Sequence, residues 1–213
     1  MKSMPQLLGA IGLAVGMAAT AQAAPITGGT TTVTLTIAST LGALGASVSP
    51  LGTATLNTSG TYPVATFPIT GGSTSSTGDM IQHNGSGLEI SASNPTTIVN
   101  TQNYLVDTAN EVIDAAVSEN GTSVGTIGLF TLGSSGLTNV PLTLTSGAVT
   151  ALNTAFGLSG QDALTTSTPI GTLTSTPIAV AVAVAAPEPA TAAVVGVGLL
   201  ALAAARRRTR AAL

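Results

Sequence analysis

The stretch from residue 25 to residue 187 contains no lysine and no arginine, although the chain is 213 residues long. All five basic side chains lie at its two ends, and they are Lys2, Arg206, Arg207, Arg208 and Arg210. The central stretch contains acids only, and these are Asp79, Glu89, Asp107, Glu111, Asp114, Glu119 and Asp162. Without ion pairs to lysine or arginine, its fold has to rest on apolar burial and backbone hydrogen bonds. Without cations to meet phosphate, it is not expected to bind nucleic acid.

The composition of the chain favours β-strands. Charged residues make up 6% of the sequence, against about 25% in an average domain, and aromatic residues make up 2%. Low charge together with high mean hydropathy argues against disorder. Small polar and β-branched residues, which are abundant here, favour short strands joined by turns.

The first 23 residues have the layout of a secretory signal peptide. Lys2 precedes a 13-residue apolar run, Leu7 to Ala19, which has the length of a signal-peptide core and is short for a membrane span. Ala21 and Ala23 are the small residues that a signal peptidase reads, so we expect cleavage after Ala23. The alternative, a buried N-terminal helix, does not account for the Ala-x-Ala ending.

An uncharged run of 16 residues, 190–205, lies near the C-terminus and is followed directly by the arginines. As a helix it would reach about 24 Å, less than the ~30 Å hydrocarbon core of a bilayer. An arginine cluster after an apolar run is a stop-transfer signal that stays on the cytoplasmic side. The sequence therefore predicts a transmembrane helix at 190–205, a cytoplasmic tail at 206–213 and an exported domain at 24–186. A core helix with a solvated basic end, the competing interpretation, does not explain why bases are absent elsewhere.

Pro187-Glu188-Pro189, the apolar run and the arginine cluster follow one another in the last 27 residues. In this order they resemble the PEP-CTERM sorting signal of Gram-negative bacteria. The resemblance implies that residues 187–213 are recognised by an exosortase, a membrane transpeptidase-like enzyme, which removes the helix and the tail. It also implies release to the cell surface, often into an exopolysaccharide matrix. The prolines forbid helix and would hold Glu188 in an extended segment outside the membrane.

Alternation of polar and apolar residues predicts a series of strands in the middle of the chain. The expected strands are 31–38, 61–70, 88–91, 97–107, 111–117, 122–132, 142–145, 170–174 and 178–185. Pro63 and Pro68 assign the segment 61–70 to a sheet edge. Asn120-Gly121 predicts a tight hairpin turn.

One helix is expected at 148–156, where apolar residues recur at helical spacing after a capping Ser146. The segments 39–49 and 74–78 are expected to be loops. Residues 24–186 are thus predicted to form a single all-β domain, a β-sandwich or jelly roll with one short helix.

The segment from Gly87 to Gly157 is similar to a region of PEP-CTERM surface proteins. The similarity rests on short motifs, namely GLEI, NYLVDTANEVIDAAV, GLFTL and LTLTSGAVTALNTAFG. The same motifs resemble the strand-rich repeat of bacterial haem-uptake surface proteins. No tyrosine–histidine pair lines up within them in the sequence.

The residue types that usually carry catalysis are scarce. With no cysteine and a single histidine, a thiol nucleophile and a multi-histidine metal site are both excluded. No Gly-x-Ser-x-Gly elbow or phosphate-binding loop occurs. The histidine, His83, lies in the segment 81–87, which reads as a polar turn, so a Ser–His–Asp triad is not expected. We therefore expect neither an enzyme nor a bound cofactor.

Three acids, Asp107, Glu111 and Asp114, flank one predicted turn. Carboxylate oxygens are the ligands that Ca²⁺ prefers, but the spacing does not match a known calcium loop. Solvated strand ends and a calcium site both remain open at this stage, and we assign no metal site.

Two functions from different classes fit the sequence. The first is a structural or adhesive protein of the cell surface or extracellular matrix, processed by a signal peptidase and an exosortase. Exopolysaccharide and self-association through lysine-free sheet edges are its candidate interactions. The second is a surface ligand-binding module for haem or glycan. For haem, His83 or a tyrosine would be the axial ligand, whereas for glycan the absence of tryptophan removes the usual stacking surface.

Overall fold

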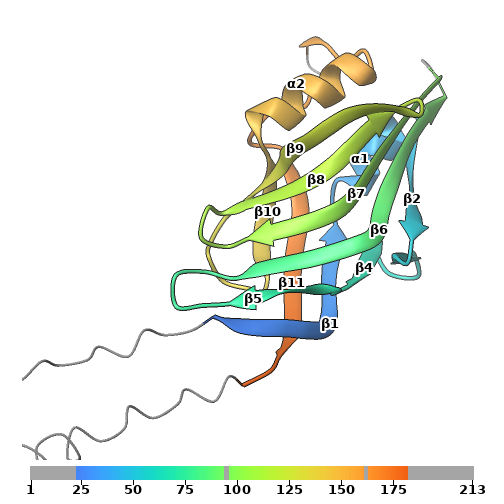
Figure 1. The fold of residues 1–213 in the computed structure, drawn as a ribbon. Helices are drawn as coiled ribbons and strands as arrows, with labels where there is room; N and C mark the ends of the chain where they lie inside the picture. The colour runs from blue at the N-terminus through green and yellow to red at the C-terminus, as the bar shows by residue number, and fades with distance from the viewer. Residues whose placement is uncertain (1–22, 94–95, 161–162, 182–213) are drawn as a thin grey trace, which may run out of the picture. The chain divides into compact units, whose positions relative to one another are not determined.

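The computed structural model describes residues 23–93, 96–160 and 163–181, which belong to one compact unit of the chain (Figure 1). The sorting motif, the apolar run and the arginine tail lie outside these ranges, as do the signal-peptide residues before Ala23. Within the described ranges, no helix is both long enough and apolar enough to cross a membrane. The processing segments at the two ends therefore stay predictions.

The described residues form eleven strands and two helices. In chain order they are β1 (Ala24–Leu35), α1 (Ala38–Ala43), β2 (Ala46–Gly52), β3 (Thr55–Asn57), β4 (Val64–Pro68), β5 (Gly71–Thr74), β6 (Met80–Ser93), β7 (Thr96–Asp107), β8 (Val112–Glu119), β9 (Thr122–Leu132), β10 (Val140–Leu144), α2 (Ser146–Ala155) and β11 (Pro169–Ala179). All strand pairings are antiparallel. The prediction of an all-β domain is confirmed.

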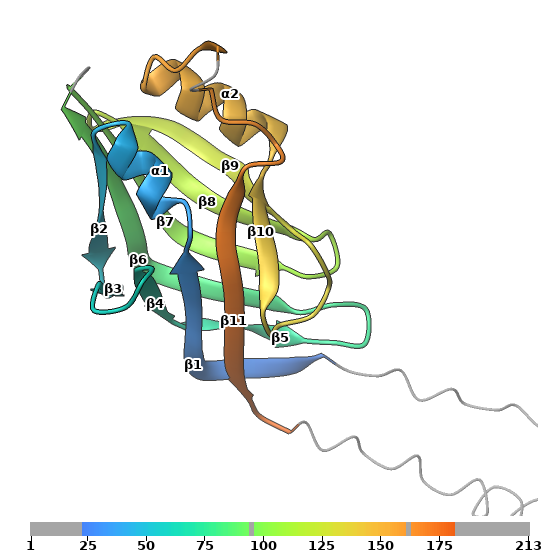
Figure 2. The ribbon, with the colours of Figure 1, turned by 180° about the vertical axis from the view of Figure 1, so that it is seen from behind.

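The strands belong to one sheet in which the first strand of the chain, β1, pairs with the last, β11. Its order is β11-β10-β9-β8-β7-β6-β5-β1-β4-β3, with β2 added beside β6. Because β1 pairs with β11 as well as with β4 and β5, the path from β1 back to β11 is closed. Figures 1 and 2 place β1, β10 and β11 on one side of this sheet and β6 to β9 on the other. The two layers expected of a sandwich are thus parts of one continuous hydrogen-bonded sheet.

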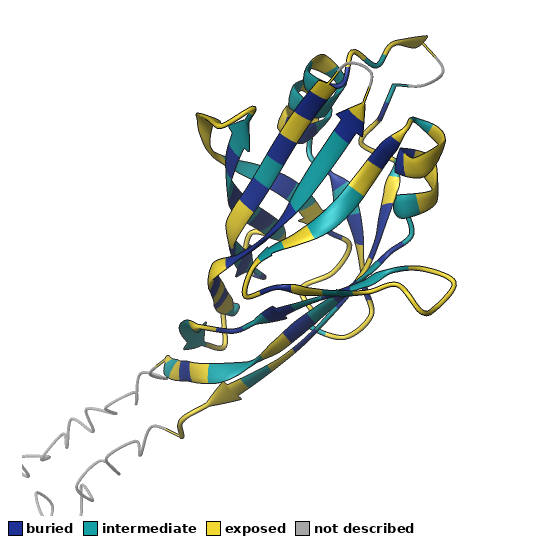
Figure 3. Cartoon of the chain, turned by 90° about the vertical axis from the view of Figure 1, so that its right-hand side faces the viewer, coloured by how far each residue is buried: buried dark blue, intermediate teal, exposed yellow. Residues whose placement is uncertain are grey.

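Apolar side chains that alternate along the strands fill the inside of the sheet. In β8, Ile113, Ala115 and Val117 are buried, while the residues between them are half-buried. In β1, Val33 and Leu35 are buried in the same way, and both belong to the same hydrophobic cluster as the β8 residues. Figure 3 shows this alternation as dark blue bands along the strands. The fold therefore rests on apolar burial, as the lack of ion pairs predicted.

The sequence predictions are most accurate in the middle of the chain. The expected antiparallel pair at 97–107 and 111–117 is found as β7 and β8, and β9 has the predicted bounds. Asn120 and Gly121 have φ angles of 50° and 79°, which is the pairing of positive angles that a tight hairpin turn of this type requires. The Asn120 side chain also accepts a hydrogen bond from the Ile98 backbone N–H (2.9 Å).

The loop predicted at 39–49 is wrong. It contains most of α1 and the first part of β2, so the described residues form two helices and not one. Leu41 anchors α1 because its side chain is buried in the core, and β2 pairs with β6 along its whole length. Helices of this length owe their stability to tertiary packing, so the local pattern gave no signal.

The assignment of 61–70 to a sheet edge is also wrong. β4, which lies within it, pairs with β1 on one side and with β3 on the other. Pro63 precedes the strand, and Pro68 is its last residue. The strand β2 pairs only with β6 among the described strands, so its other edge is open, and Pro50 lies in this strand. Pro50 therefore takes the role of edge guard that the sequence analysis gave to the other two prolines.

The helix predicted at 148–156 is present as α2, but its cap is one residue away from the predicted one. The Thr145 hydroxyl accepts a hydrogen bond from the Ala148 backbone N–H (3.1 Å), so Thr145, and not Ser146, caps the helix. The same hydroxyl donates to the Gly128 carbonyl (2.6 Å) and ties the helix to β9. Gly157, with φ at 61°, follows the last turn as a C-terminal glycine commonly does.

Candidate functional site

The segment 81–87 is not the polar turn that the sequence predicted, because it lies within β6. β6 and β7 run in register as far as His83, which is opposite Tyr104. The register resumes where Gly87 faces Gln102. Between these points β6 has more residues than β7, which is a β-bulge.

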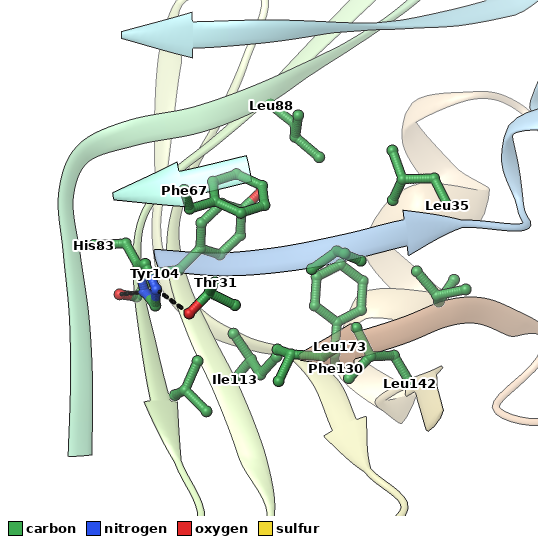
Figure 4. A pocket seen from close by; sticks show the side chains of 13 residues that line it. Thr31, Leu35, Phe67, His83, Leu88, Tyr104, Ile113, Phe130, Leu142 and Leu173 are labelled. Carbon is green, nitrogen blue, oxygen red and sulfur yellow. Dashed lines mark hydrogen bonds between the residues drawn. The ribbon is translucent and has the colours of Figure 1, made fainter. Parts of the chain in front are cut away.

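Residues with left-handed backbone angles form the bulge. Gly85 and Asn103 have positive φ angles, 75° and 55°, and the Asn103 side chain accepts a hydrogen bond from the Gly85 N–H (2.8 Å). His83 and Tyr104 follow the regular alternation of their strands, with Ile81 buried two residues before His83. His83 and Tyr104 consequently lie inside the sheet, 1% and 6% exposed (Figure 4).

Both ring nitrogens of His83 have partners. Nδ1 lies 3.3 Å from the Tyr104 carbonyl oxygen, and Nε2 lies 2.7 Å from the Thr31 hydroxyl. A carbonyl only accepts, so Nδ1 carries the proton and Nε2 accepts from Thr31. The Thr31 oxygen is in turn 2.7 Å from the Ser175 hydroxyl, which then donates to it. The chain Ser175–Thr31–His83–Tyr104 is therefore fully satisfied, and it joins β11, β1, β6 and β7.

Burial keeps His83 uncharged. It lowers the pKa of His83 from 6.5 to about 4, and the hydrogen bond to the Tyr104 carbonyl opposes this effect only in part. At neutral pH the ring is a neutral imidazole, which is the form that can accept a hydrogen bond from Thr31.

Tyr104 is held from its other end. Its hydroxyl lies 2.6 Å from the Thr101 hydroxyl, which donates to the Leu88 carbonyl (3.1 Å). Tyr104 is therefore the donor to Thr101, and burial raises the pKa of Tyr104 so that the phenol stays protonated. The ring of Phe67 stands edge-on to Tyr104 and to His83, with centroids 5.2 and 6.2 Å away, an arrangement favoured between aromatic rings.

These side chains border a cavity of about 40 Å³ inside the sheet (Figure 4). Its lining is Thr31, Val33, Leu35, Phe67, His83, Leu88, Tyr104, Val106, Ile113, Phe130, Leu142, Ile170 and Leu173. The volume is enough for water and far below the roughly 300–1,000 Å³ of small-molecule sites. Among the described residues, the buried side-chain polar atoms without a partner belong to Thr36 and Asn100. Neither residue lines this cavity, so the buried polar side-chain atoms that line it all have hydrogen-bond partners within the protein.

Thr31 and His83 have the contact of a hydroxyl nucleophile with its general base. Each is only 1% exposed, so the pair is shielded from bulk solvent. The arrangement therefore acts as a structural polar network that links β1, β6 and β11 in an otherwise apolar core.

The structure separates the three acids that were weighed as a calcium site. The Asp107 carboxylate accepts hydrogen bonds from the Asn110 side chain (2.7 Å) and from the backbone N–H groups of Ala109 and Asn110 (3.0 Å each). These bonds, the one from the Asn110 side chain first, hold the pKa of Asp107 below its ordinary value. Glu111 lies in the turn with φ at 54°, and Asp114 lies within β8. Across the described ranges, no group of three or more Asp, Glu, His or Cys side chains is placed to hold a metal ion.

A larger hollow of about 500 Å³ lies beside α2. It is lined by Val99, Thr101, Val117, Glu119, Val124, Ile127, Leu129, Gly147, Ala148, Thr150, Ala151, Leu152, Thr154 and Ala155. We call it the α2 groove. Its lining contains no aromatic ring and one ionisable group, Glu119.

Of the predicted processing residues, the structure describes only Ala23, which is exposed directly before β1. The others lie outside the described residues, and they are Ala21, Pro187, Glu188, Pro189, Arg206, Arg207, Arg208 and Arg210. Their roles remain expectations from the sequence.

The partners of His83 were not predicted from the sequence. Thr31 and Ser175 are 144 residues apart, and Tyr104 was not recognised as a neighbour of His83. One signal was present: Thr31 and Ser175 occupy the inward phase of strands whose other inward residues include Val33, Leu35 and Leu173. A hydroxyl residue at a position where the strand pattern otherwise places apolar side chains indicates a buried hydrogen-bond partner.

Comparison with known proteins gives one match among solved structures. No protein-family model matches the chain, and no curated protein matches it. The crystal structure of the C-terminal domain of HtaA from Corynebacterium glutamicum aligns with a TM-score of 0.49 and 12% identity. The alignment covers 70% of this chain and 95% of that one. A likeness of this degree assigns no role to any residue.

Proposed function

We propose that the chain is an exported structural or adhesive protein of the bacterial cell surface or extracellular matrix. A signal peptidase removes residues 1–23, and an exosortase acts at Pro187-Glu188-Pro189. The observation that carries this proposal is the charge distribution: all five bases lie at the ends, and residues 25–187 contain none. Bases that stay on the cytoplasmic side account for that distribution.

The path of the chain through the sheet is consistent with this proposal. Ile26, near the start of β1, lies opposite Ala179 at the end of β11. The Val180 N–H also bonds to the Pro25 carbonyl (3.0 Å). Both connections to the processing segments therefore leave from one end of the sheet. The closed sheet between them needs neither disulfides nor ion pairs to fold.

The interior also favours a structural role over catalysis. The only histidine is sealed in the core with both nitrogens bonded to neighbouring residues. Surface acids without accompanying cations would keep the domain soluble outside the cell and away from nucleic acid.

Fractionation of cells that express the full chain tests the proposal. We expect the protein at the cell surface or in the medium, accessible to proteinase K added to intact cells. Glu188→Ala should hold it in the membrane fraction, whereas the control Glu119→Ala should behave as wild type. Wild-type protein that is cytoplasmic and protease-resistant in intact cells contradicts export.

A second candidate, a surface ligand-binding module, is favoured by the α2 groove, whose volume of about 500 Å³ falls in the range of small-molecule sites. The groove suits an aliphatic ligand better than haem or glycan. Its lining has no base for a haem propionate, no axial ligand and no ring for sugar stacking.

Titration of the protein with haem, followed by absorbance, tests the haem version of this candidate. We expect no protein-dependent Soret shift, because His83 and Tyr104 are both bonded inside the core. A saturable shift that Tyr104→Phe abolishes would favour the haem-binding module instead.

A further inference from the structure

One outer face of the sheet is a regular array of threonines. Four neighbouring strands, β11, β1, β4 and β3, carry it. We call it the threonine face, and its members are Thr30, Thr32, Thr34, Thr55, Thr66, Thr172, Thr174 and Thr176. All eight are exposed or half-buried, while the residues between them on β1, such as Thr31 and Val33, point inward.

The strand register aligns these threonines in rows. Thr174 lies opposite Thr32, which lies opposite Thr66 on its other side. Thr66 in turn lies opposite Thr55, so one row of four threonines crosses four strands. Residues directly opposite on neighbouring strands share a face of the sheet.

Two further rows flank the first. Thr30 lies opposite Thr176, and Thr34 lies opposite Thr172. Six of the threonines therefore form three cross-strand pairs between β1 and β11. Because β1 and β11 are adjacent, the side chains on one strand are rotated relative to those on the other only by the ordinary twist of about 20–25°.

The array has fixed repeats and stiff members. Neighbouring strands lie about 4.8 Å apart, and residues i and i+2 on one strand about 6.7 Å apart. Threonine has few χ1 choices because it is β-branched. Hydrogen bonds restrain several of the hydroxyls: Thr176 donates to the Thr30 carbonyl (3.1 Å), and Thr32 donates to the Thr174 carbonyl (3.3 Å).

The threonine face carries no charge and no aromatic ring. None of the seven acids of the domain lies on β1, β3, β4 or β11. The rings of Phe67, Tyr104 and Phe156 are buried, and the exposed ring among the described residues is that of Tyr62, which precedes β4. A ligand recognised by charge or by ring stacking is therefore a poor match. What the face offers is a lattice of hydroxyl and methyl groups.

We propose that the threonine face binds ice. The two repeats of the array are close to those with which water oxygens recur on prism faces of hexagonal ice. Hydroxyl groups at these repeats anchor an ordered water layer, and the methyl groups between them exclude disordered water. Waters that bridge two surfaces contribute nearly as much enthalpy as direct hydrogen bonds. An uncharged, repeating and rigid surface is what such a layer requires.

Ice-affinity partitioning of the full chain, with the same detergent in every sample, tests the proposal. Wild-type protein should be enriched several-fold in a slowly grown ice crystal relative to a carrier protein, and should shape crystals and inhibit recrystallisation. Thr32 lies between Thr174 and Thr66 in the row of four, so Thr32→Tyr should lower the enrichment several-fold. The control Thr126→Tyr, at an exposed threonine of β9 away from this face, should retain it.

Three outcomes would overturn the proposal. The first is exclusion of wild-type protein from ice to the same degree as the carrier. The second is equal enrichment of the Thr32 and Thr126 variants, both shown to be folded by circular dichroism and melting temperature. The third is retention on microcrystalline cellulose without enrichment in ice, which would assign the face to a neutral polysaccharide. None of these assays depends on signal processing, so their results stand apart from the proposed function.

Discussion

Thr30 and Thr31 are neighbours in β1 with opposite surroundings. Thr31 faces the core and donates to the only histidine, while Thr30 is exposed and lies beside Thr176. The same residue type thus serves as a buried hydrogen-bond donor at one position and as part of a solvent-facing array at the next. Strand periodicity alone produces this difference.

The first prediction compares these two residues. Thr31→Val keeps the shape but leaves His83 Nε2 and the Ser175 hydroxyl without their partner. An unsatisfied buried polar group costs about 1–3 kcal/mol, so we expect a loss of that size. Thr30→Val should change stability by less than about 0.5 kcal/mol. Urea denaturation of both variants measures the difference, and equal midpoints would contradict the role assigned to the buried network.

The second prediction concerns pH. Because the pKa of His83 is about 4 in the folded protein and 6.5 without burial, the unfolded chain binds more protons between these values. The free energy of unfolding should therefore be highest above pH 6.5, where His83 is neutral in both states, and should fall as the pH drops toward 4. The loss over this window is about 3 kcal/mol.

Urea midpoints measured at steps from pH 7.5 to pH 4 check this second prediction. His83→Gln removes the titrating group and should flatten the curve in that window. The Asp107 pKa is lowered and not raised, so its contribution is lost at lower pH and does not produce the same slope. A wild-type curve that is flat from pH 6.5 to 4.5 would contradict the burial of a neutral His83.

At the level of elements, hydroxyls tie both ends of α2 to the sheet: Thr145 at its start, and Thr97 of β7, which donates to the Ala155 carbonyl (3.1 Å) at its end. Thr145 caps the helix and also bonds to β9 through the Gly128 carbonyl. Loss of a threonine cap costs about 1–2 kcal/mol, so Thr145→Ala should destabilise the domain by about that amount. Ser146→Ala, at the position that the sequence favoured, should leave the thermal midpoint nearly unchanged. The reverse order in a melting experiment would contradict the assignment of the cap.

Elements set by local chemistry could be predicted from the sequence. The hairpin between β8 and β9 follows from Asn120-Gly121, and β7 and β8 follow from their alternation. β6 could not be predicted in full, because the residues from Asn84 to Gly87 have turn chemistry and the strand accommodates them as a bulge against β7. The short helix α1 was missed because its stability comes from Leu41 in the core and not from its own sequence.

The candidate site was missed for the same reason. It depends on His83 of β6 reaching Thr31 of β1 and on β1 pairing with β11, and neither contact is encoded within a short window. The scarcity of catalytic residue types was readable from composition. The burial of His83 against Thr31 was not, since it needs the closed sheet.

At the level of the whole molecule, the closure between β1 and β11 joins the two ends of the domain. The paired residues, such as Val33 and Leu173, are distant in the chain, and no local pattern specifies their register. This closure leaves few open strand edges, and Pro50 lies on one of them. Self-association through a sheet edge, which the sequence suggested, stays a prediction.

The proposed function requires that the domain is exported and cut free at both ends. The intact mass of the protein, recovered from the culture medium and from the cell envelope, tests it most directly, because residues 25–187 offer trypsin no site. We predict a mass for a polypeptide that begins at Ala24 and ends near Pro187-Glu188-Pro189, or a larger one with a group attached at the new C-terminus. A mature protein that retains Arg206 to Arg210 would contradict exosortase processing and identify a stably anchored membrane protein.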